Sequence, residues 1–190
     1  MYHIYFEMQV ALQFYCLVII NSVLLLRPVN SFTKITNIQC SSLDKNFSDF
    51  GKCRLSVPER GVIAMGVHVK LFQMPVNNIS INLSFFKKAS GYRSFLYNVS
   101  ADFCAFMANK KRYPFLNIFF DILLKESNIN HTCPYSHDII VKNLILRDEM
   151  FGRIPVPAGE YMFKLMVGAY NEWKADVKAY FSIRLNKRER

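Results

Sequence analysis

The chain has 190 residues, of which 52% are hydrophobic, and a formal net charge of +10. A chain of this length and composition can bury a core of ordinary domain size. Its basic residues are scattered, and no strand combines aromatic and basic residues in the manner of an RNA-binding module, so we expect no nucleic-acid partner. Solvated loops account for the charge, and contact with a membrane surface is the second explanation.

The first 31 residues are typical of a secretory signal peptide. Residues 10–26 are mostly apolar, Arg27 and Pro28 end this run, and Val29 and Ser31 are small residues at positions suited to cleavage. The segment before the run lacks Lys and Arg, unlike most signal peptides, and the alternative is an uncleaved membrane anchor. We expect cleavage after Ser31, export to the extracellular space, and a single domain over residues 32–190.

Four cysteines follow the signal segment, and their even number predicts two disulfides in a secreted chain. Three connectivities are possible, and we favour the two local pairs, Cys40–Cys53 and Cys104–Cys133. A zinc site is a weaker alternative, because the chain has no Cys-x-x-Cys pair and few histidines near its cysteines.

Five Asn-x-Ser/Thr sequons agree with export and predict glycosylation at exposed positions. Their asparagines are Asn46, Asn78, Asn82, Asn98 and Asn130.

Alternating apolar and polar residues predict about eight strands in the mature chain. Their approximate ranges are 35–40, 50–55, 62–72, 78–85, 95–103, 139–146, 160–167 and 172–185. Asn78, Asn82 and Asn98 all fall on polar faces, which supports the assigned registers independently. In the last strand, Trp173 falls on the inward face and Lys174 on the outward face. One-sided alternation of this kind indicates antiparallel sheets packed face to face as a β-sandwich.

One helix is predicted over residues 114–125, with Pro114 in its first turn. Asn117, Asp121 and Lys125 form one narrow polar stripe, and the other positions are apolar. Because this apolar surface is wider than one-sided packing requires, we expect contacts on more than one side. The helix is either a buried core element or a lid that touches the sandwich on one side and a ligand or membrane on another.

No motif in the sequence indicates catalysis or a cofactor. The chain has no Gly-x-Ser-x-Gly, zinc-protease, phosphate-loop or dinucleotide signature. We therefore expect neither an enzyme nor a cofactor or metal site. The inward strand faces are rich in Phe, Tyr and Met, which suits either a filled core or a hollow interior for acyl chains or sterols.

Five segments resemble the signatures of a large insect family of small secreted proteins of unknown function. These segments are residues 32–40, 47–55, 91–99, 127–135 and 155–161, and Asn130-His131-x-Cys133-Pro134-Tyr135 is the most specific part. That family is distantly related to the ML lipid-recognition domains, which include the ganglioside activator protein and the Niemann–Pick-type sterol carrier. It is also similar to the chemosensory protein B group. The resemblance implies an immunoglobulin-like β-sandwich with a lipid-accommodating interior, although Ser94 stands where the usual pattern has Pro.

These observations together predict a secreted glycoprotein that binds or presents a hydrophobic ligand, such as a lipid, a fatty-acid derivative or a hydrocarbon. The predicted cavity residues are Phe95, Tyr97, Val99 and Phe103 from a strand and Phe115, Phe119, Phe120 and Leu123 from the helix. The alternative is a filled sandwich that acts as a receptor-accessory or protein-interaction module, for example in chemosensation, with a membrane receptor or membrane surface as its partner.

Overall fold

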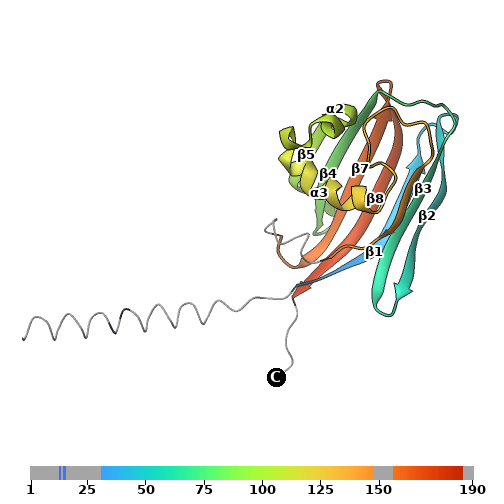
Figure 1. The fold of residues 1–190 in the computed structure, drawn as a ribbon. Helices are drawn as coiled ribbons and strands as arrows, with labels where there is room; N and C mark the ends of the chain where they lie inside the picture. Colours follow the sequence, from blue (N-terminus) through green and yellow to red (C-terminus); the bar gives the residue numbers. More distant parts are fainter. Residues whose placement is uncertain (1–12, 14, 16–30, 148–155, 186–190) are drawn as a thin grey trace, which may run out of the picture. The chain divides into compact units, whose positions relative to one another are not determined.

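Two antiparallel sheets face each other, as the alternating sequence pattern predicted (Figure 1). The computed structural model describes residues 13, 15, 31–147 and 156–185. Apart from isolated positions, the signal peptide predicted over residues 1–31 lies outside this described part. Within it, Ser31–Leu185 forms one compact unit.

The larger sheet has five strands in the order β1, β8, β7, β4, β5, and the smaller sheet has three in the order β2, β3, β6. Their bounds are β1 Ser31–Ser42, β2 Ser48–Glu59, β3 Val62–Leu71, β4 Ile79–Lys88, β5 Tyr92–Asp102, β6 Ile139–Leu144, β7 Gly159–Ala169 and β8 Glu172–Leu185. The chain is therefore an all-β sandwich, and the predicted fold class is confirmed.

Both predicted disulfides are confirmed. Cys40 in β1 bonds to Cys53 in β2, which ties one edge of the large sheet to the small sheet. Cys104 bonds to Cys133 in the connection that follows the main helix. Each bond keeps a loop closed when the chain unfolds. The unfolded chain therefore has less conformational entropy, which stabilises the folded state relative to it.

The predicted registers of β4 and β5 are confirmed by burial and pairing. Ile81 and Leu83 are buried between the sheets, whereas Asn82 and Asn98 lie on the outer face. There, the Asn82 side-chain amide donates a hydrogen bond to Asn98 Oδ1 at 2.7 Å. Four of the five sequon asparagines are exposed, and Asn82 is half-buried.

The main helix, α3 (Pro114–Lys125), has the predicted bounds and begins with Pro114. A second short helix, α2 (Phe103–Ala108), and a 3-10 turn, η1 (Lys110–Arg112), precede it and were not predicted. The predicted strand end at Phe103 is therefore wrong. Asp102 caps α2 by accepting a hydrogen bond from the Ala105 N–H at 2.9 Å, so the chain leaves the sheet at this residue.

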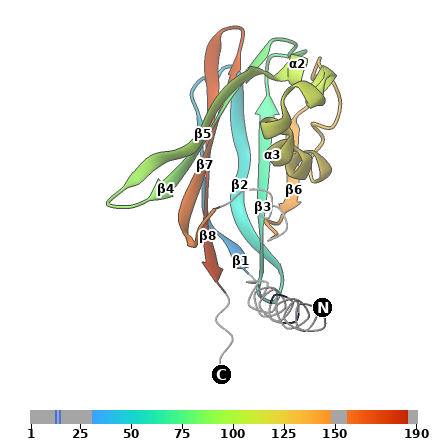
Figure 2. The same ribbon diagram turned by 90° about the vertical axis from the view of Figure 1, so that its left-hand side faces the viewer.

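Helices α2 and α3 cover the side of the sandwich where β5 and β6 are the edge strands. Figure 2 shows α3 beside β6, and Figure 1 shows both helices next to β4 and β5. The opposite side is closed by β1 and β2, whose disulfide holds the sheets together. The helices therefore fill the side on which no disulfide joins the sheets.

The predicted orientation of the first residues of β8 is wrong. The pairing of β7 with β8 shifts between Val167 and Gly168, which leaves Lys174 as an extra residue between the paired residues Trp173 and Ala175. Such a bulge exchanges the inward-facing and outward-facing residues on the N-terminal side of the strand. Trp173 is consequently 45% exposed, whereas Lys174 is only 8% exposed.

Among the described residues, no helix is both long and apolar enough to cross a bilayer.

Candidate functional site

A cavity of about 280 Å³ lies between the two sheets and beneath α3. Every strand except β5 contributes side chains to its described lining, and the walls are almost entirely aliphatic and aromatic. The strand residues include Ile35, Phe50, Met65, Val67, Val69, Ile81, Leu83, Val141, Leu144, Phe163, Leu165, Val177 and Ala179. The sandwich is therefore hollow rather than fully packed, a question that the alternating pattern left open.

Helix α3 contacts apolar groups on two sides, which confirms the expectation drawn from its wide apolar surface. Leu116, Phe120 and Leu124 are buried, and the Phe120 ring lies 5.2 Å from the ring of Phe106 in α2. Phe119 and Leu123 line the cavity together with Phe120, and the Phe119 ring lies 4.8 Å from that of Phe163 in β7. One face of the helix thus belongs to the core, and the neighbouring face forms the cavity wall.

Four of the eight predicted cavity residues line this cavity: Phe103, Phe119, Phe120 and Leu123. The other four, Phe95, Tyr97, Val99 and Phe115, do not. The three β5 residues do face inward, but other side chains cover them, and Val99 packs against the buried cluster that includes Phe106 and Leu116 of the helices. Phe95 packs on Phe85, at a centroid distance of 5.8 Å, and Tyr97 packs on Phe115.

The connection after α3 forms one wall of the cavity through Ile129 and Tyr135. The Tyr135 hydroxyl donates to the carbonyl groups of Ile129 and His131, and Cys133 anchors the same connection to α2. Burial raises the pKa of Tyr135 to about 12. Its hydroxyl is therefore neutral and already engaged with the backbone, so this wall behaves as an apolar surface.

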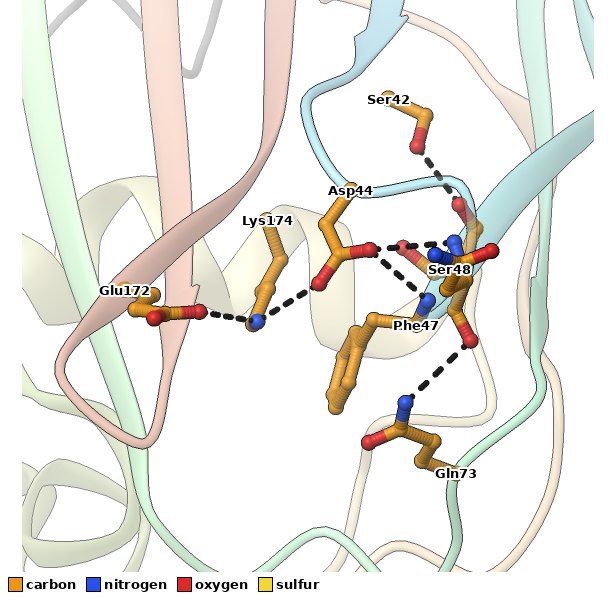
Figure 3. A network of polar contacts seen from close by, with 8 residues as sticks. Ser42, Asp44, Phe47, Ser48, Gln73, Glu172 and Lys174 are labelled. Atoms are coloured by element: carbon orange, nitrogen blue, oxygen red, sulfur yellow. Dashed lines mark hydrogen bonds and ion pairs between the residues drawn. The ribbon is translucent and has the colours of Figure 1, made fainter.

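A cation, Lys174, lines the cavity at the end where β1 joins β2 and β7 joins β8 (Figure 3). Its ammonium group lies 2.8 Å from Asp44 Oδ2 and 2.7 Å from Glu172 Oε2. The same group lies 5.1 Å above the ring of Phe47, which also lines the cavity. The bulge in β8 places this side chain here, and strict alternation would have directed it outward.

The pairing of Lys174 with two carboxylates fixes its charge. The hydrogen bond from Lys174 lowers the pKa of Asp44 below its usual value. The hydrogen bonds to Asp44 and then to Glu172 raise the pKa of Lys174. Asp44 also accepts hydrogen bonds from the backbone N–H groups of Asn46 and Phe47, so the turn holds this carboxylate in place. All three groups are charged at neutral pH, and together they carry one net negative charge.

The same end of the sandwich carries several exposed apolar side chains on its strand connections. We call this surface the loop end; its exposed apolar residues are Leu43, Phe72, Met74, Tyr170 and Trp173. Hydrogen bonds join these connections to one another, including Leu43 N–H to the Lys174 carbonyl and Phe72 N–H to the Phe47 carbonyl. The loop end is therefore one continuous surface over the Lys174 end of the cavity.

Histidines form two polar pairs outside the described lining of the cavity. His68 lies 2.8 Å from Asp138, and His131 lies 2.9 Å from His137. Within residues 31–147 and 156–185, no group of three or more His, Cys, Asp or Glu side chains is placed to hold a metal ion.

The fold and the cavity define a disulfide-linked β-sandwich with an apolar chamber. The model of a family described as a protein of unknown function, DUF1091, matches residues 81–163. The match begins within β4 and ends within β7, so it includes both helices and the connection that carries Cys133 and Tyr135. No curated protein matches the chain.

Proposed function

We propose that this protein is a secreted carrier or presenter that encloses a hydrophobic molecule between its two sheets. The observation that carries the proposal is the cavity of about 280 Å³ with almost entirely apolar walls. Apolar cavities smaller than this one stay dry and bind small apolar molecules. Ligand sites in proteins begin at about 300 Å³, so the size suits one small ligand or part of a longer chain.

Burial of apolar surface supplies the binding free energy in this proposal. Each Å² of apolar ligand surface removed from water contributes about 25 cal/mol before the costs of ordering are subtracted. Cavity walls from both sheets and α3 surround the ligand, so little of its surface remains in water. We assign Phe119 and Leu123 to the movable wall, because both line the cavity from α3, which is not a member of either sheet.

Two disulfides and five sequons support export, because disulfides persist in oxidising compartments. A distant relation to the ML lipid-recognition domains is consistent with this proposal and forms part of it.

Native mass spectrometry of the secreted, glycosylated protein tests the proposal directly. We expect a co-purifying apolar molecule, or uptake of one from a lipid extract, with the mass of a one-to-one complex. A protein that carries no ligand, takes up none and excludes apolar dyes would contradict the proposal.

A matched pair of substitutions tests where the ligand lies. Val177 lines the cavity, whereas Val99 faces inward from β5 but does not. Val177→Phe fills part of the cavity and should strongly reduce binding of the uncharged dye phenylnaphthylamine. Val99→Phe adds the same bulk outside the cavity and should leave binding close to that of the wild type. Equal effects of the two substitutions would place the ligand elsewhere.

The loop end favours a second candidate function, docking to a membrane surface or membrane receptor. Its exposed Phe72, Met74, Tyr170 and Trp173 are residue types enriched at protein and membrane interfaces. In this alternative the protein acts as a receptor-accessory module. Phe72→Ser with Trp173→Ser should abolish vesicle or receptor binding and leave dye uptake unchanged if the loop end is such a surface.

A further inference from the structure

The described lining of the cavity includes one charged side chain, Lys174, and its pairing bears on the class of ligand. Among the described lining residues, three have polar side-chain atoms: Ser48, Tyr135 and Lys174. The hydroxyl of Tyr135 donates to backbone carbonyl groups, and Ser48 is neutral. Recognition of a charged head group inside the cavity would therefore depend on Lys174.

Lys174 has little capacity left for an anionic ligand. Two of the three donor positions of its ammonium group are taken by Asp44 and Glu172, at 2.8 and 2.7 Å. The local charge of the three groups is already −1, so an incoming carboxylate would be repelled rather than neutralised. A buried carboxylate without a counter-charge is strongly disfavoured.

The two carboxylates of this cluster do not serve a cationic ligand either. Asp44 and Glu172 are absent from the cavity lining, to which the cluster contributes only Lys174. The Glu172 side chain is 74% exposed and faces water. A cationic head group inside the cavity would therefore meet the Lys174 side chain rather than the carboxylates. The Lys174 side chain lines this end of the cavity, while its ammonium group is paired with the two carboxylates.

We infer that the ligand is an uncharged apolar molecule, such as a hydrocarbon or a long-chain ester, and that ionised fatty acids are excluded by the Asp44–Lys174–Glu172 cluster. This inference rests on the proposed function, since it specifies the ligand of the same cavity. The cluster acts by holding the ammonium charge away from the ligand, so it determines specificity without providing much of the binding free energy.

Competition between an uncharged ester and the corresponding carboxylate tests the inference. Methyl dodecanoate and dodecanoate should be compared, below their micelle-forming concentrations and at neutral pH, for displacement of phenylnaphthylamine. We expect the ester to bind roughly tenfold more tightly or better, which corresponds to about 1.4 kcal/mol. Equal or tighter binding of dodecanoate would overturn the inference while leaving the carrier function intact. Failure of the dye and of both ligands to bind would instead remove the proposed function.

Substitution of the carboxylates tests the assigned cause. Asp44→Asn with Glu172→Gln leaves the Lys174 ammonium without a counter-charge, so the preference for the ester should shrink or reverse. Glu172→Gln alone should reduce the difference in affinity between the ester and dodecanoate. This variant is expected to fold, because the Glu172 side chain is mostly exposed. Circular dichroism checks that each variant is folded. The assignment would be overturned if the ratio of the ester and dodecanoate affinities stayed unchanged both in Glu172→Gln and in the double variant.

Glu160→Gln is the matched control. Glu160 forms an ion pair with Lys88 at 2.5 Å. It lies near the start of β7, nine residues before Ala169 at the other end of the strand, which is a separation of about 30 Å. Glu160→Gln changes the net charge of the protein by the same amount as Glu172→Gln. The ratio of the ester and dodecanoate affinities should nevertheless stay at the wild-type value. A shift equal to that of Glu172→Gln would show that overall charge, rather than the cluster, sets the preference.

Discussion

At the residue scale, Lys174 is the position where the orientation predicted from the local pattern differs most from the orientation in the structure. It lies in a strand whose later residues alternate regularly, and its charge predicts an outward position. The bulge opposite Gly168 turns it inward, where two carboxylates stabilise its charge. Conformational irregularities of this kind in sheets often occur beside functional sites.

The ion pair of Lys174 predicts a defined pH dependence of stability. The pKa of Asp44 is lowered in the folded protein, chiefly by Lys174, so this carboxylate stabilises the fold above its unfolded pKa of about 3.9. That contribution is lost as the pH falls through the lower folded pKa. Lys174→Met should therefore reduce the free energy of unfolding at pH 7, and the difference from the wild type should shrink below about pH 4. Urea unfolding of both proteins across this pH range measures the difference in unfolding free energy. A difference that does not change with pH would contradict the prediction.

Gly168 provides a second prediction at this scale. A Cβ atom at this position would lie 2.7 Å from Ser80 Oγ and 3.1 Å from the Glu172 carbonyl oxygen. We expect Gly168→Ala to reduce stability by about 1–3 kcal/mol, because the backbone of the bulge must shift. Gly91→Ala is the control, since no atom lies within 4 Å of a Cβ there. Equal urea midpoints for the two variants would show that the bulge tolerates the methyl group.

At the element scale, α3 has two apolar faces with different roles. Leu116 is buried and absent from the cavity lining, whereas Phe119 is half-buried and lines the cavity. Leu116→Ala should cost about 2–5 kcal/mol of unfolding free energy, as for other buried leucines. Phe119→Ala should cost clearly less and instead change dye affinity. Urea unfolding and dye titration of both variants separate the two faces, and identical profiles would contradict the assignment.

The two disulfides also differ in what they hold. Cys104–Cys133 anchors the connection that forms the Tyr135 wall, whereas Cys40–Cys53 joins the sheets on the far side. Replacing either pair by serines should cost roughly 3 kcal/mol, since the closed loops are short. Only loss of Cys104–Cys133 should also speed ligand exchange, measured by stopped-flow dye displacement. Equal exchange rates in the two variants would show that this wall does not gate the cavity.

At the scale of the whole molecule, the proposed carrier function predicts that a bound ligand raises the stability of the hollow sandwich. A ligand at a hundredfold excess over its Kd should stabilise the fold by about 2.7 kcal/mol. For a domain of this size, that corresponds to a rise in Tm of roughly 5–10 °C. Calorimetry of the delipidated and methyl dodecanoate-saturated protein measures the rise. The Val177→Phe variant should lose most of the gain, and an undiminished gain there would place the ligand outside the cavity.

The loop end lies at the Lys174 end of the cavity. Five exposed apolar side chains lie over the Lys174 end, on connections that hydrogen bonds join together. A carrier and a receptor-accessory module share this geometry, because a ligand must pass from a membrane or partner into the interior. The two proposed functions are therefore separable by the substitutions at Val177 and Trp173.

Local sequence determined much of this fold. Period-two alternation located the eight strands and the inward faces of β4 and β5, because a half-buried strand must alternate. Pro114 and the apolar run after it gave the bounds of α3, and cysteine spacing gave both disulfide pairs. Each of these features depends on residues close together in the chain.

Tertiary structure alone decided which inward residues surround a space. Phe95, Tyr97 and Val99 pack against Phe85 and the helices rather than around the cavity, and these contacts join segments distant in the chain. The bulge exchanged Trp173 and Lys174, because it arises from the pairing of β7 with β8 rather than from either strand alone. Whether the interior is filled or hollow depends on how far apart the packed layers lie, and no local pattern encodes that distance.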